Sequence, residues 1–391
     1  MKIEHAVNIE DLRREAKRYL PRMLFDFIEG GAEDERAIER NRSVFDDYRL
    51  LPRYLLDSSK GNQSVPLLGR TYASPFGIAP TGSAAVFRPN ADLMLAKAAA
   101  AANIPYVMSG ACNASIEECA RIAPEQMWFQ LYMTRNKPHN EDIIRRLRAA
   151  GVGTLVLTVD SEVRSRRERD MRNRFSFGTF TFKPSVALEA LSHPRWIANY
   201  LASGGMPTMQ NWVPYAGRGA GAKDVMRYFH SLLPGVPLWS DIELLRGMWP
   251  GKLVIKGILH PSDAERAAQL GVDGIILSNH GGRQLDRAPS PVDVLGTIVA
   301  AVGTRLTVML DGGIRRGSDI LVALSLGAKF VFVGRATLYG AAAGGLTGVT
   351  RAIDILRDEV DANQRQIGCT EVGQLGPENL WRLGVGMQAS V

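Results

Sequence analysis

The sequence predicts a (β/α)₈ TIM barrel with an N-terminal helical extension and a long loop after the fourth strand. Short apolar runs of strand length recur along the chain, and about 20 to 30 residues with one helical pattern separate most neighbouring runs. There are about eight such runs, the number that closes this barrel. They cover residues 76–79, 106–108, 128–131, 155–159, 253–255, 274–277, 307–310 and 330–333.

Helical patterns fill the spaces between the runs and extend to both ends of the chain. Those within the barrel cover residues 92–102, 116–122, 142–150 and 318–326. Apolar spacing predicts an N-terminal helix over 8–20 and a second over 21–28, ending at Gly30 and Gly31. We expect this extension to cover the floor or the flank of the barrel. A further amphipathic helix is predicted over 346–360, and the tail beyond Gly368 shows no pattern.

One gap, between Asp160 and Lys252, is about three times longer than the others. This insertion, about residues 161–252, begins rich in arginine and continues rich in Pro, Gly and Trp. It follows the fourth strand, so it must lie on the side where the carboxyl ends of the strands gather. A barrel over about 70–345, the insertion and the two extensions account for 391 residues, so we expect one domain over 1–391. Gly217, Gly219 and Gly221 follow no strand and indicate a loop, not a dinucleotide fingerprint.

Composition predicts a soluble cytoplasmic protein. No apolar run is long enough to span a bilayer, and the N-terminus lacks a signal-peptide core. Cys112, Cys119 and Cys369 are odd in number and lack metal spacing, so we expect reduced thiols and no metal site. The net charge of +7 suits nucleic acid, an acidic membrane surface or an anionic substrate.

Much of the positive charge is local. Six arginines fall within eleven residues shortly after Asp160: Arg164, Arg166, Arg167, Arg169, Arg172 and Arg174. Such a run is usually a solvated face, but an arginine turned inward would bind a carboxylate through its planar fork.

Polar residues follow the predicted strands at their carboxyl ends, where barrel enzymes do their chemistry. Lys256 follows the fifth run, and Ser278 and His280 follow the sixth. A lysine and a histidine at neighbouring strand ends indicate a catalytic site. The earlier ends add Pro80, Thr81, Gly82, Ser109, Gly110, Gln130, Tyr132, Thr158 and Asp160.

The last two strands end in glycine-rich turns, Asp311-Gly312-Gly313-Ile314-Arg315 and Gly334-Arg335. Barrels often bind phosphate at these two positions on backbone N–H groups, and glycine permits the close approach. Arg315 or Arg335 would neutralise the charge. One such turn is more often a plain turn, but two at adjacent strand ends favour a phosphate site.

The run SNHGGRQLD, from Ser278 to Asp286, resembles the signature of the FMN-dependent L-2-hydroxy acid oxidising family, which includes glycolate oxidase, lactate oxidase, flavin lactate dehydrogenases and mandelate dehydrogenase. Other matching segments occur in the family's order: FDFIEGGAED (25–34), APTG (79–82), WFQLY (128–132), TVD (158–160), RERDMRNRF (167–175), VIKG (254–257) and DGGIRRG (311–317). HPRW (193–196), GMP (205–207) and QIGC (366–369) are most similar to the mandelate and bacterial membrane-associated lactate dehydrogenases.

The resemblance implies oxidation of a mandelate- or lactate-like 2-hydroxy acid to the 2-keto acid. His280 corresponds to the base, and Asp160 would accept a hydrogen bond from its imidazole and stabilise the imidazolium. Arg283 and Arg167 match the partners of the substrate carboxylate and oxyanion. Tyr132 would place its hydroxyl against the substrate oxygens.

The implied cofactor is FMN, with Lys256 beside flavin N1 and O2, where a fixed positive charge stabilises the reduced flavin. The expected FMN-binding set is Pro80, Thr81, Gly82, Ser109, Gln130, Thr158, Lys256, Ser278, Asp311, Gly312, Gly313, Arg315, Gly334 and Arg335.

Three positions depart from the family pattern. Phe27 stands where the family usually has a tyrosine that helps bind the substrate carboxylate, so one hydroxyl is missing from the expected substrate site. Many relatives carry a hydroxyl residue at the position of Gly110. Gly82 is alanine in several oxidases but glycine in mandelate dehydrogenase, which favours a quinone-like electron acceptor over oxygen and hydrogen peroxide formation.

The insertion has two interpretations. Its aromatic residues lie among basic ones and suit either peripheral contact with the inner face of the cytoplasmic membrane or a lid over a hydrophobic substrate. They are Phe177, Phe180, Phe182, Trp196, Tyr200 and Trp212. Relatives imply a homotetramer, and we expect no nucleic-acid partner. One alternative is another FMN barrel enzyme, which would share the phosphate site but has no reason to pair His280 with Arg283. The others are a non-catalytic flavin-binding barrel and an RNA-binding barrel, which would not need His280, Asp160 and Lys256 together.

Overall fold

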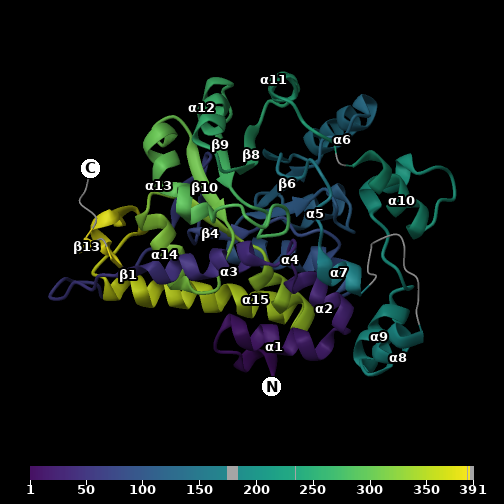
Figure 1. The fold of residues 1–391 in the computed structure, drawn as a ribbon, viewed down its shortest axis with the longest axis horizontal. Helices are drawn as coiled ribbons and strands as arrows, with labels where there is room; N and C mark the ends of the chain where they lie inside the picture. Colours follow the sequence, from purple (N-terminus) through teal and green to yellow (C-terminus); the bar gives the residue numbers. More distant parts are fainter. Residues whose placement is uncertain (174–183, 234, 385, 388–391) are drawn as a thin grey trace.

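The computed structural model describes residues 1–173, 184–233, 235–384 and 386–387, and its centre is a closed barrel of eight parallel strands (Figure 1). Strands pair with their neighbours in chain order, and the last strand pairs with the first. The predicted fold is confirmed. The strands are β4 (Phe76–Ile78), β5 (Tyr106–Ser109), β6 (Met127–Leu131), β7 (Thr154–Thr158), β8 (Lys252–Ile258), β9 (Gly274–Leu277), β10 (Thr307–Asp311) and β11 (Phe330–Val333).

Side chains fill the barrel interior, so the strands form a packed core rather than a pore. Buried members of this layer include Val107, Trp128, Val156, Val254, Ile276, Met309, Phe330 and Phe332. The space for a site is therefore confined to the strand ends and the loops above them.

The outer helices follow the predicted periodicity with two differences. They are α4 (Ala91–Ala102), α5 (Ile116–Ile122), α6 (Lys137–Ala149), α12 (Pro261–Gln269), α13 (Pro291–Val302), α14 (Gly317–Ser325) and α15 (Arg335–Gln366). Helix α6 begins before the expected residue 142 because Asn136 caps it by accepting from the His139 N–H, whereas the apolar pattern starts only at Ile143. Helix α15 consists of two helical segments that meet at a kink at Gly345 (φ 60°); the predicted helix is the second, and the first, from Arg335, was not predicted.

The N-terminal helices α1 (Ile9–Tyr19), α2 (Arg22–Glu29) and α3 (Arg36–Ser43) cover the flank, where α1 packs along α15 (Figure 1). Of the two places expected for this extension, floor or flank, the flank is the one that α1 occupies. A hairpin of β2 (Val65–Leu67) and β3 (Arg70–Tyr72) packs at the floor, with Leu67 and Tyr72 in the apolar cluster of the barrel interior. Strands of three residues are too short to give a periodic signal, so this hairpin escaped prediction.

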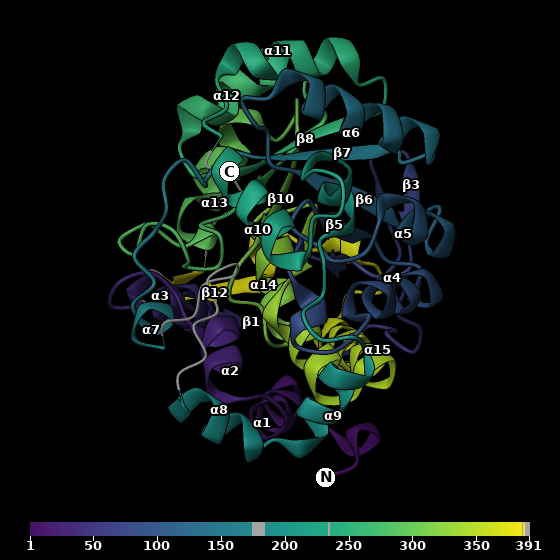
Figure 2. The ribbon, with the colours of Figure 1, turned by 90° about the vertical axis from the view of Figure 1, so that its right-hand side faces the viewer.

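The insertion folds into short helices beside the barrel (Figure 2). They are α7 (Glu168–Arg172), α8 (Pro184–Leu191), α9 (Pro194–Ala202), the 3₁₀ turn η4 (Gln210–Tyr215), α10 (Ala222–Leu232) and α11 (Trp239–Met248). Asn199 donates to the Tyr19 hydroxyl at 2.9 Å, which ties α9 to α1. Gly217 and Gly219 lie between η4 and α10 with positive φ, as predicted for a loop.

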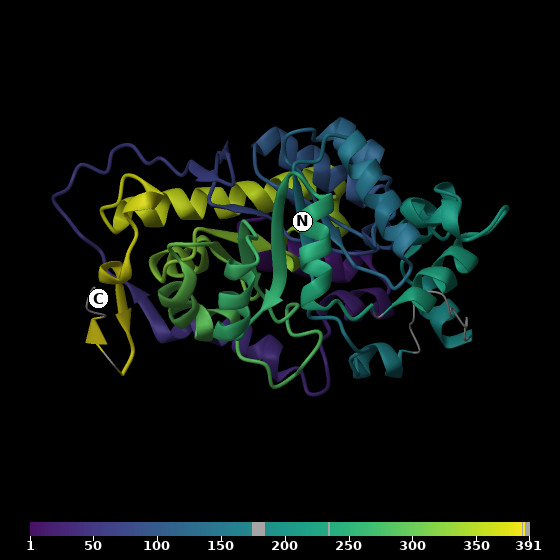
Figure 3. The same ribbon diagram turned by 90° about the horizontal axis from the view of Figure 1, so that it is seen from above.

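At the other end of the molecule, β1 (Tyr48–Leu50), β12 (Leu380–Arg382) and β13 (Gly386–Met387) form a small antiparallel sheet (Figure 3). The sheet joins the N-terminal extension to the tail in which the sequence showed no pattern. Among the described residues, no helix is both long enough and apolar enough to cross a bilayer.

The hairpin at the barrel floor generates a stability prediction. The buried Trp128 indole donates to the Tyr72 hydroxyl at 3.1 Å. Tyr72→Phe removes this acceptor and leaves the indole N–H unsatisfied, so we expect a loss of about 1 to 3 kcal/mol in the free energy of unfolding. Urea titration measures it, with the exposed Tyr54→Phe as the control. Equal stability of the two variants would contradict the role of this bond.

Candidate active site

His280 lies just beyond β9 and pairs with Asp160, which lies just beyond β7. The distance between His280 Nδ1 and Asp160 Oδ1 is 2.9 Å. Burial acts to raise the pKa of Asp160, but attraction to His280 and Lys256 outweighs it, and the pKa is lowered. An ionised carboxylate thus orients the imidazole, and it is His280 that lines the cavity while Asp160 stands behind it.

The N-terminal extension braces the loop that carries His280. Asn41 on α3 and Asn279 exchange two side-chain hydrogen bonds of 2.8 Å, and both residues are buried. The Gly282 N–H donates to Asn279 Oδ1 at 3.1 Å. A Cβ on Gly282 would lie 2.8 Å from the Ile38 nitrogen, so a larger residue would push α3 away. His280 itself has φ 57°, a left-handed conformation that this bracing must maintain.

Lys256 at the end of β8 is a buried ammonium with two anchors. Its Nζ donates to Ser278 Oγ at 2.7 Å and lies 3.2 Å from Asp311 Oδ2. Ser278 in turn donates to Asp311 Oδ1 at 2.6 Å. Burial opposes the charged form, but Asp311 and Asp160 outweigh it and raise the pKa of Lys256. The site therefore contains a fixed positive charge.

Arg283 lies beneath α2 and retains one unused donor toward the site. Its Nη1 donates to the carbonyls of Phe27 and Gly30, both at 2.7 Å, and its guanidinium carbon lies 4.6 Å from the centre of the Phe27 ring. Within the described structure, its buried Nη2 has no hydrogen-bond partner. Burial and the nearby charges of Arg167 and Arg335 lower the pKa of Arg283. An anion beside Nη2 would relieve both the desolvation and the repulsion.

Three polar side chains on one side of the cavity fit a ring with several donors and acceptors. Thr81 Oγ1, Gln130 Nε2 and Thr158 Oγ1 are buried and have no partner in the described part of the chain, although buried polar atoms are normally paired. Ser109 donates to Gln130 Oε1 at 3.1 Å, which engages the amide oxygen and leaves the amide nitrogen for the cavity. The uracil-like edge of a flavin has the matching groups.

The two glycine-rich strand ends lie at the same cavity. Gly312 and Gly313 have φ of 109° and 80°, and a Cβ on Gly313 would lie 1.8 Å from the Asn41 carbonyl oxygen. Around Gly334, by contrast, a Cβ would meet nothing closer than 3.8 Å, so this turn is open to a ligand. The structure fits a phosphate group at these two turns.

The two arginines of these turns have different roles in the structure. Arg335 donates from all three nitrogens to backbone carbonyls, those of Ile28, Gly281 and Gly30, at 2.8 to 3.0 Å. Arg315 makes one such bond, from Nη1 to the Ile314 carbonyl. Arg335 therefore holds α2 and the His280 loop together, and Arg315 is better placed to neutralise a phosphate.

The structure brings nearly all sequence-predicted residues to one cavity. Asp160, Ser109 and Ser278 do not line it, and each stands behind a residue that does: His280, Gln130 and Lys256 respectively. The remaining predicted residues line it directly: Phe27, Pro80, Thr81, Gly82, Gln130, Tyr132, Thr158, Arg167, Lys256, His280, Arg283, Asp311, Gly312, Gly313, Arg315, Gly334 and Arg335.

Sequence reasoning missed the cavity wall contributed by the insertion. Met209, Met226, Phe229 and His230 line the cavity, the last three from α10. Val225, Met226 and Phe229 are buried at helical spacing, a signal present in the sequence. What the sequence does not show is which surface this face packs against.

The arginine run and the aromatic residues divide between surface and interior. Arg167 lines the cavity, Arg164 and Arg166 are exposed, and Arg174 lies outside the described residues. Trp196 and Trp212 are buried, and Tyr200 stacks on Trp196, so these three face the protein rather than a membrane. Phe177, Phe180 and Phe182 lie outside the described residues. Exposed apolar side chains nearby are Leu188, Leu191 and Leu201.

One continuous cavity thus has donors unsatisfied within the described residues and suited to a flavin ring at one part, the open Gly334 turn beside the Gly312-Gly313 turn and suited to its phosphate at another, and an acid–base pair beside them. This defines a flavin-dependent oxidoreductase built on a (β/α)₈ barrel. The family model for the FMN-dependent dehydrogenases matches residues 16–382 of the sequence, so the chain belongs to that family. The predicted family, its FMN cofactor and its oxidoreductase class are confirmed.

Two curated relatives and one solved structure illustrate the similarity. The chain is 41% identical over 388 residues to (S)-mandelate dehydrogenase of Pseudomonas putida, covering 99% of this chain and 97% of the relative. It is 38% identical to L-lactate dehydrogenase of Caulobacter vibrioides, covering 93% and 95%. The crystal structure of the monotopic membrane protein (S)-mandelate dehydrogenase superposes with a TM-score of 0.92 at 40% identity, covering 97% of this chain and 100% of that one.

Asp170 on α7 generates a pH-dependent prediction. Burial raises the pKa of its carboxyl to about 6, against the attraction of Arg283 and Arg167. The folded pKa exceeds the unfolded value of about 3.9, so ionisation costs stability above pH 6 and not below pH 4. Asp170→Asn removes this cost. Relative to wild type, its free energy of unfolding should rise by about 1 to 2 kcal/mol from pH 4 to pH 8, allowing for solvent screening.

Urea titration at a series of pH values measures this difference. The exposed Asp34→Asn variant controls for the loss of one negative charge. A difference between Asp170→Asn and wild type that falls as the pH rises would contradict the raised pKa.

Proposed function

We propose that this protein oxidises an L-2-hydroxy acid to the 2-keto acid, with His280 as the base. The observation that carries the proposal is the geometry of one loop: the His280 imidazole is held by Asp160, and Arg283, three residues later, keeps a buried unpaired Nη2 at the same cavity. An acid–base group beside a carboxylate-binding fork is what this oxidation requires.

Each side chain has a definite task. Arg283 and Arg167 bind the carboxylate, and Tyr132 orients the substrate oxygens. His280 Nε2 accepts the substrate proton, and the ionised Asp160 stabilises the imidazolium that forms. Bound FMN supplies the acceptor for the two electrons. Lys256, kept charged by Asp311, offsets negative charge that arises near it.

The cavity wall favours a mandelate-like substrate over a small one. Met209, Met226, Phe229 and Phe87 line the cavity and offer apolar surface to a bulky substrate side chain. Relatives named for mandelate and for L-lactate are both similar to this chain, so these two acids are the substrates to compare.

For the electron acceptor we propose a quinone-like molecule. The support is Gly82, which matches glycine in mandelate dehydrogenase where several oxidases have alanine. A Cβ at this position would lie 3.0 Å from the Ala111 Cβ, closer than an ordinary contact, so alanine would crowd Ala111 at the cavity wall. Oxygen as acceptor, with hydrogen peroxide as product, is the competing outcome. A quinone acceptor suits peripheral membrane contact, for which the exposed Leu188, Leu191 and Leu201 are candidates. Flotation with anionic lipid vesicles tests this contact, and sedimentation tests the homotetramer.

The proposed function has a direct test. Purified holoprotein should bleach anaerobically on addition of one or more of lactate, glycolate, mandelate and phenyllactate. Reoxidation by oxygen and by an artificial quinone is then compared. Absence of bleaching with every acid would reject the proposed function, and fast reoxidation by oxygen would reject the quinone-like acceptor.

His280→Ala should retain the flavin and lose flavin reduction by at least about 10² to 10⁴. The reason is that His280 is the one residue lining the cavity, among those the structure describes, that is hydrogen-bonded to Asp160. Stopped-flow absorbance under saturating substrate measures the rate, with the exposed His5→Ala as the control. Near-normal reduction in His280→Ala would assign the base elsewhere.

Phe27→Tyr adds a hydroxyl to the ring that Arg283 stacks on. We expect KM for a simple 2-hydroxy acid to fall by about two- to tenfold with little change in kcat, as for a hydrogen bond made equally in ground and transition states. Steady-state kinetics measure both constants. Loss of activity with the flavin still bound would show that the phenyl ring contacts the substrate side chain, and the substrate class would have to be revised.

A further inference from the structure

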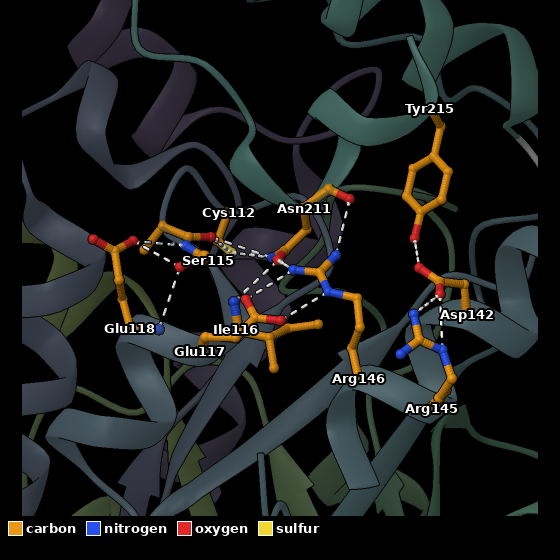
Figure 4. A network of polar contacts seen from close by, with 11 residues as sticks. Cys112, Ser115, Ile116, Glu117, Glu118, Asp142, Arg145, Arg146, Asn211 and Tyr215 are labelled. Carbon is orange, nitrogen blue, oxygen red and sulfur yellow. Dashed lines mark hydrogen bonds and ion pairs between the residues drawn. The ribbon is translucent and has the colours of Figure 1, made fainter. Parts of the chain in front are cut away.

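We propose that Arg146 and Asn211, which lie outside the cavity, are positioning residues that fix the apolar wall of the insertion over the substrate and so determine selectivity for the substrate side chain. This inference rests on the proposed oxidation of a 2-hydroxy acid. It concerns a polar network between α6, α5 and η4 (Figure 4).

The apolar wall depends on Trp212. Met226 and Phe229 line the cavity and pack in one cluster with Trp212, which is 4% exposed, and Tyr132 packs against this cluster. The rings of Trp212 and Phe229 meet edge to face at 4.7 Å. The Trp212 indole donates to the Gly110 carbonyl at 2.8 Å, which ties the wall to the end of β5. Helix α10 packs on η4, so a shift of η4 moves the wall.

Asn211, the residue before Trp212, is the hub of the anchor. It is 1% exposed, and its side chain accepts from the Ile116 N–H at 3.0 Å and donates to the Ala114 carbonyl at 3.2 Å. Arg146 donates to Asn211 Oδ1 at 3.0 Å. A paired fork of two 2.8 Å bonds joins Arg146 to Glu117, which fixes the guanidinium between α5 and α6.

A second contact anchors the other end of η4. The Tyr215 hydroxyl donates to Asp142 on α6. His139 stacks on Trp212 with ring centres 4.3 Å apart and meets Tyr215 edge-on at 4.2 Å. Burial lowers the pKa of His139 to about 4, so at neutral pH it is an uncharged spacer between the two rings. Both ends of η4 are thus fixed to the barrel by residues that do not line the cavity.

The anchoring residues do not line the cavity, so loosening the network should change how the substrate side chain fits and leave the chemistry intact. Arg146→Met removes the clamp but leaves Asn211 its bond from Ile116, so the fold should survive. Arg148→Met is the matched control, because Arg148 lies two residues later on α6, is exposed, and takes no part in this network among the described residues.

We expect KM for mandelate to rise about tenfold in Arg146→Met, while KM for lactate changes less than about twofold and kcat stays near wild type for both. Arg148→Met should behave as wild type. Trp212→Phe keeps an aromatic ring but loses the indole N–H that bonds to the Gly110 carbonyl. It should likewise raise KM for mandelate more than KM for lactate. Anaerobic flavin reduction over a range of each acid provides the constants.

A similar loss for mandelate and lactate, a loss confined to kcat, or unchanged KM values in Arg146→Met would overturn the proposal. If Arg146→Met does not fold, the same criteria apply to Trp212→Phe. Failure of the two proposals is distinguishable. Wild-type protein that no 2-hydroxy acid bleaches rejects the proposed function and this inference with it. A wild type that bleaches, together with an Arg146→Met variant whose KM values change equally for both acids or not at all, rejects only the positioning role of Arg146 and Asn211.

Discussion

Two buried guanidiniums at the carboxyl end of α2 hold the site together. Arg283 and Arg335 donate to carbonyls of residues 27, 28 and 30, which are among the groups that a helix end leaves unpaired. Cations at a helix C-terminus are also favoured by its dipole. The interaction joins the N-terminal extension to the His280 loop and the start of α15. The extension is therefore a wall of the site and not only a cover of the barrel flank.

Burying so much positive charge is costly, and the site offsets it unevenly. Lys256 has Asp311 and Asp160 nearby, so its charge is balanced within the protein. Arg283 has carbonyls for Nη1 but nothing for Nη2 within the described structure. The imbalance is largest where the substrate carboxylate is proposed to bind. A bound anion would pair with Nη2 and balance the positive charge that the free site leaves uncompensated. Recognition should therefore be strongest for a ligand that carries its own negative charge.

The strands and the residues at their ends were predictable because both depend on local pattern. Eight apolar runs fix a parallel barrel, and its topology brings distant residues such as Asp160 and His280 to one face. The floor hairpin and the start of α6 depend on short strands and a single capping side chain, which periodicity does not detect. Place in the chain alone left open whether Arg315 or Arg335 would neutralise the phosphate. The three bonds of Arg335 to backbone carbonyls depend on how α2 packs, which no local pattern specifies.

Chemistry and selectivity come from different parts of the chain. The acid–base pair, the lysine and the glycine turns follow barrel strands, and their positions are fixed by strand pairing. Met226 and Phe229 come from the insertion, and the packing of η4 on α5 and α6 helps to hold them at the cavity. A change in that packing alters the shape available to the substrate side chain without moving His280 or Lys256. If the proposed roles hold, a new substrate range requires no change in the groups proposed to carry out the oxidation.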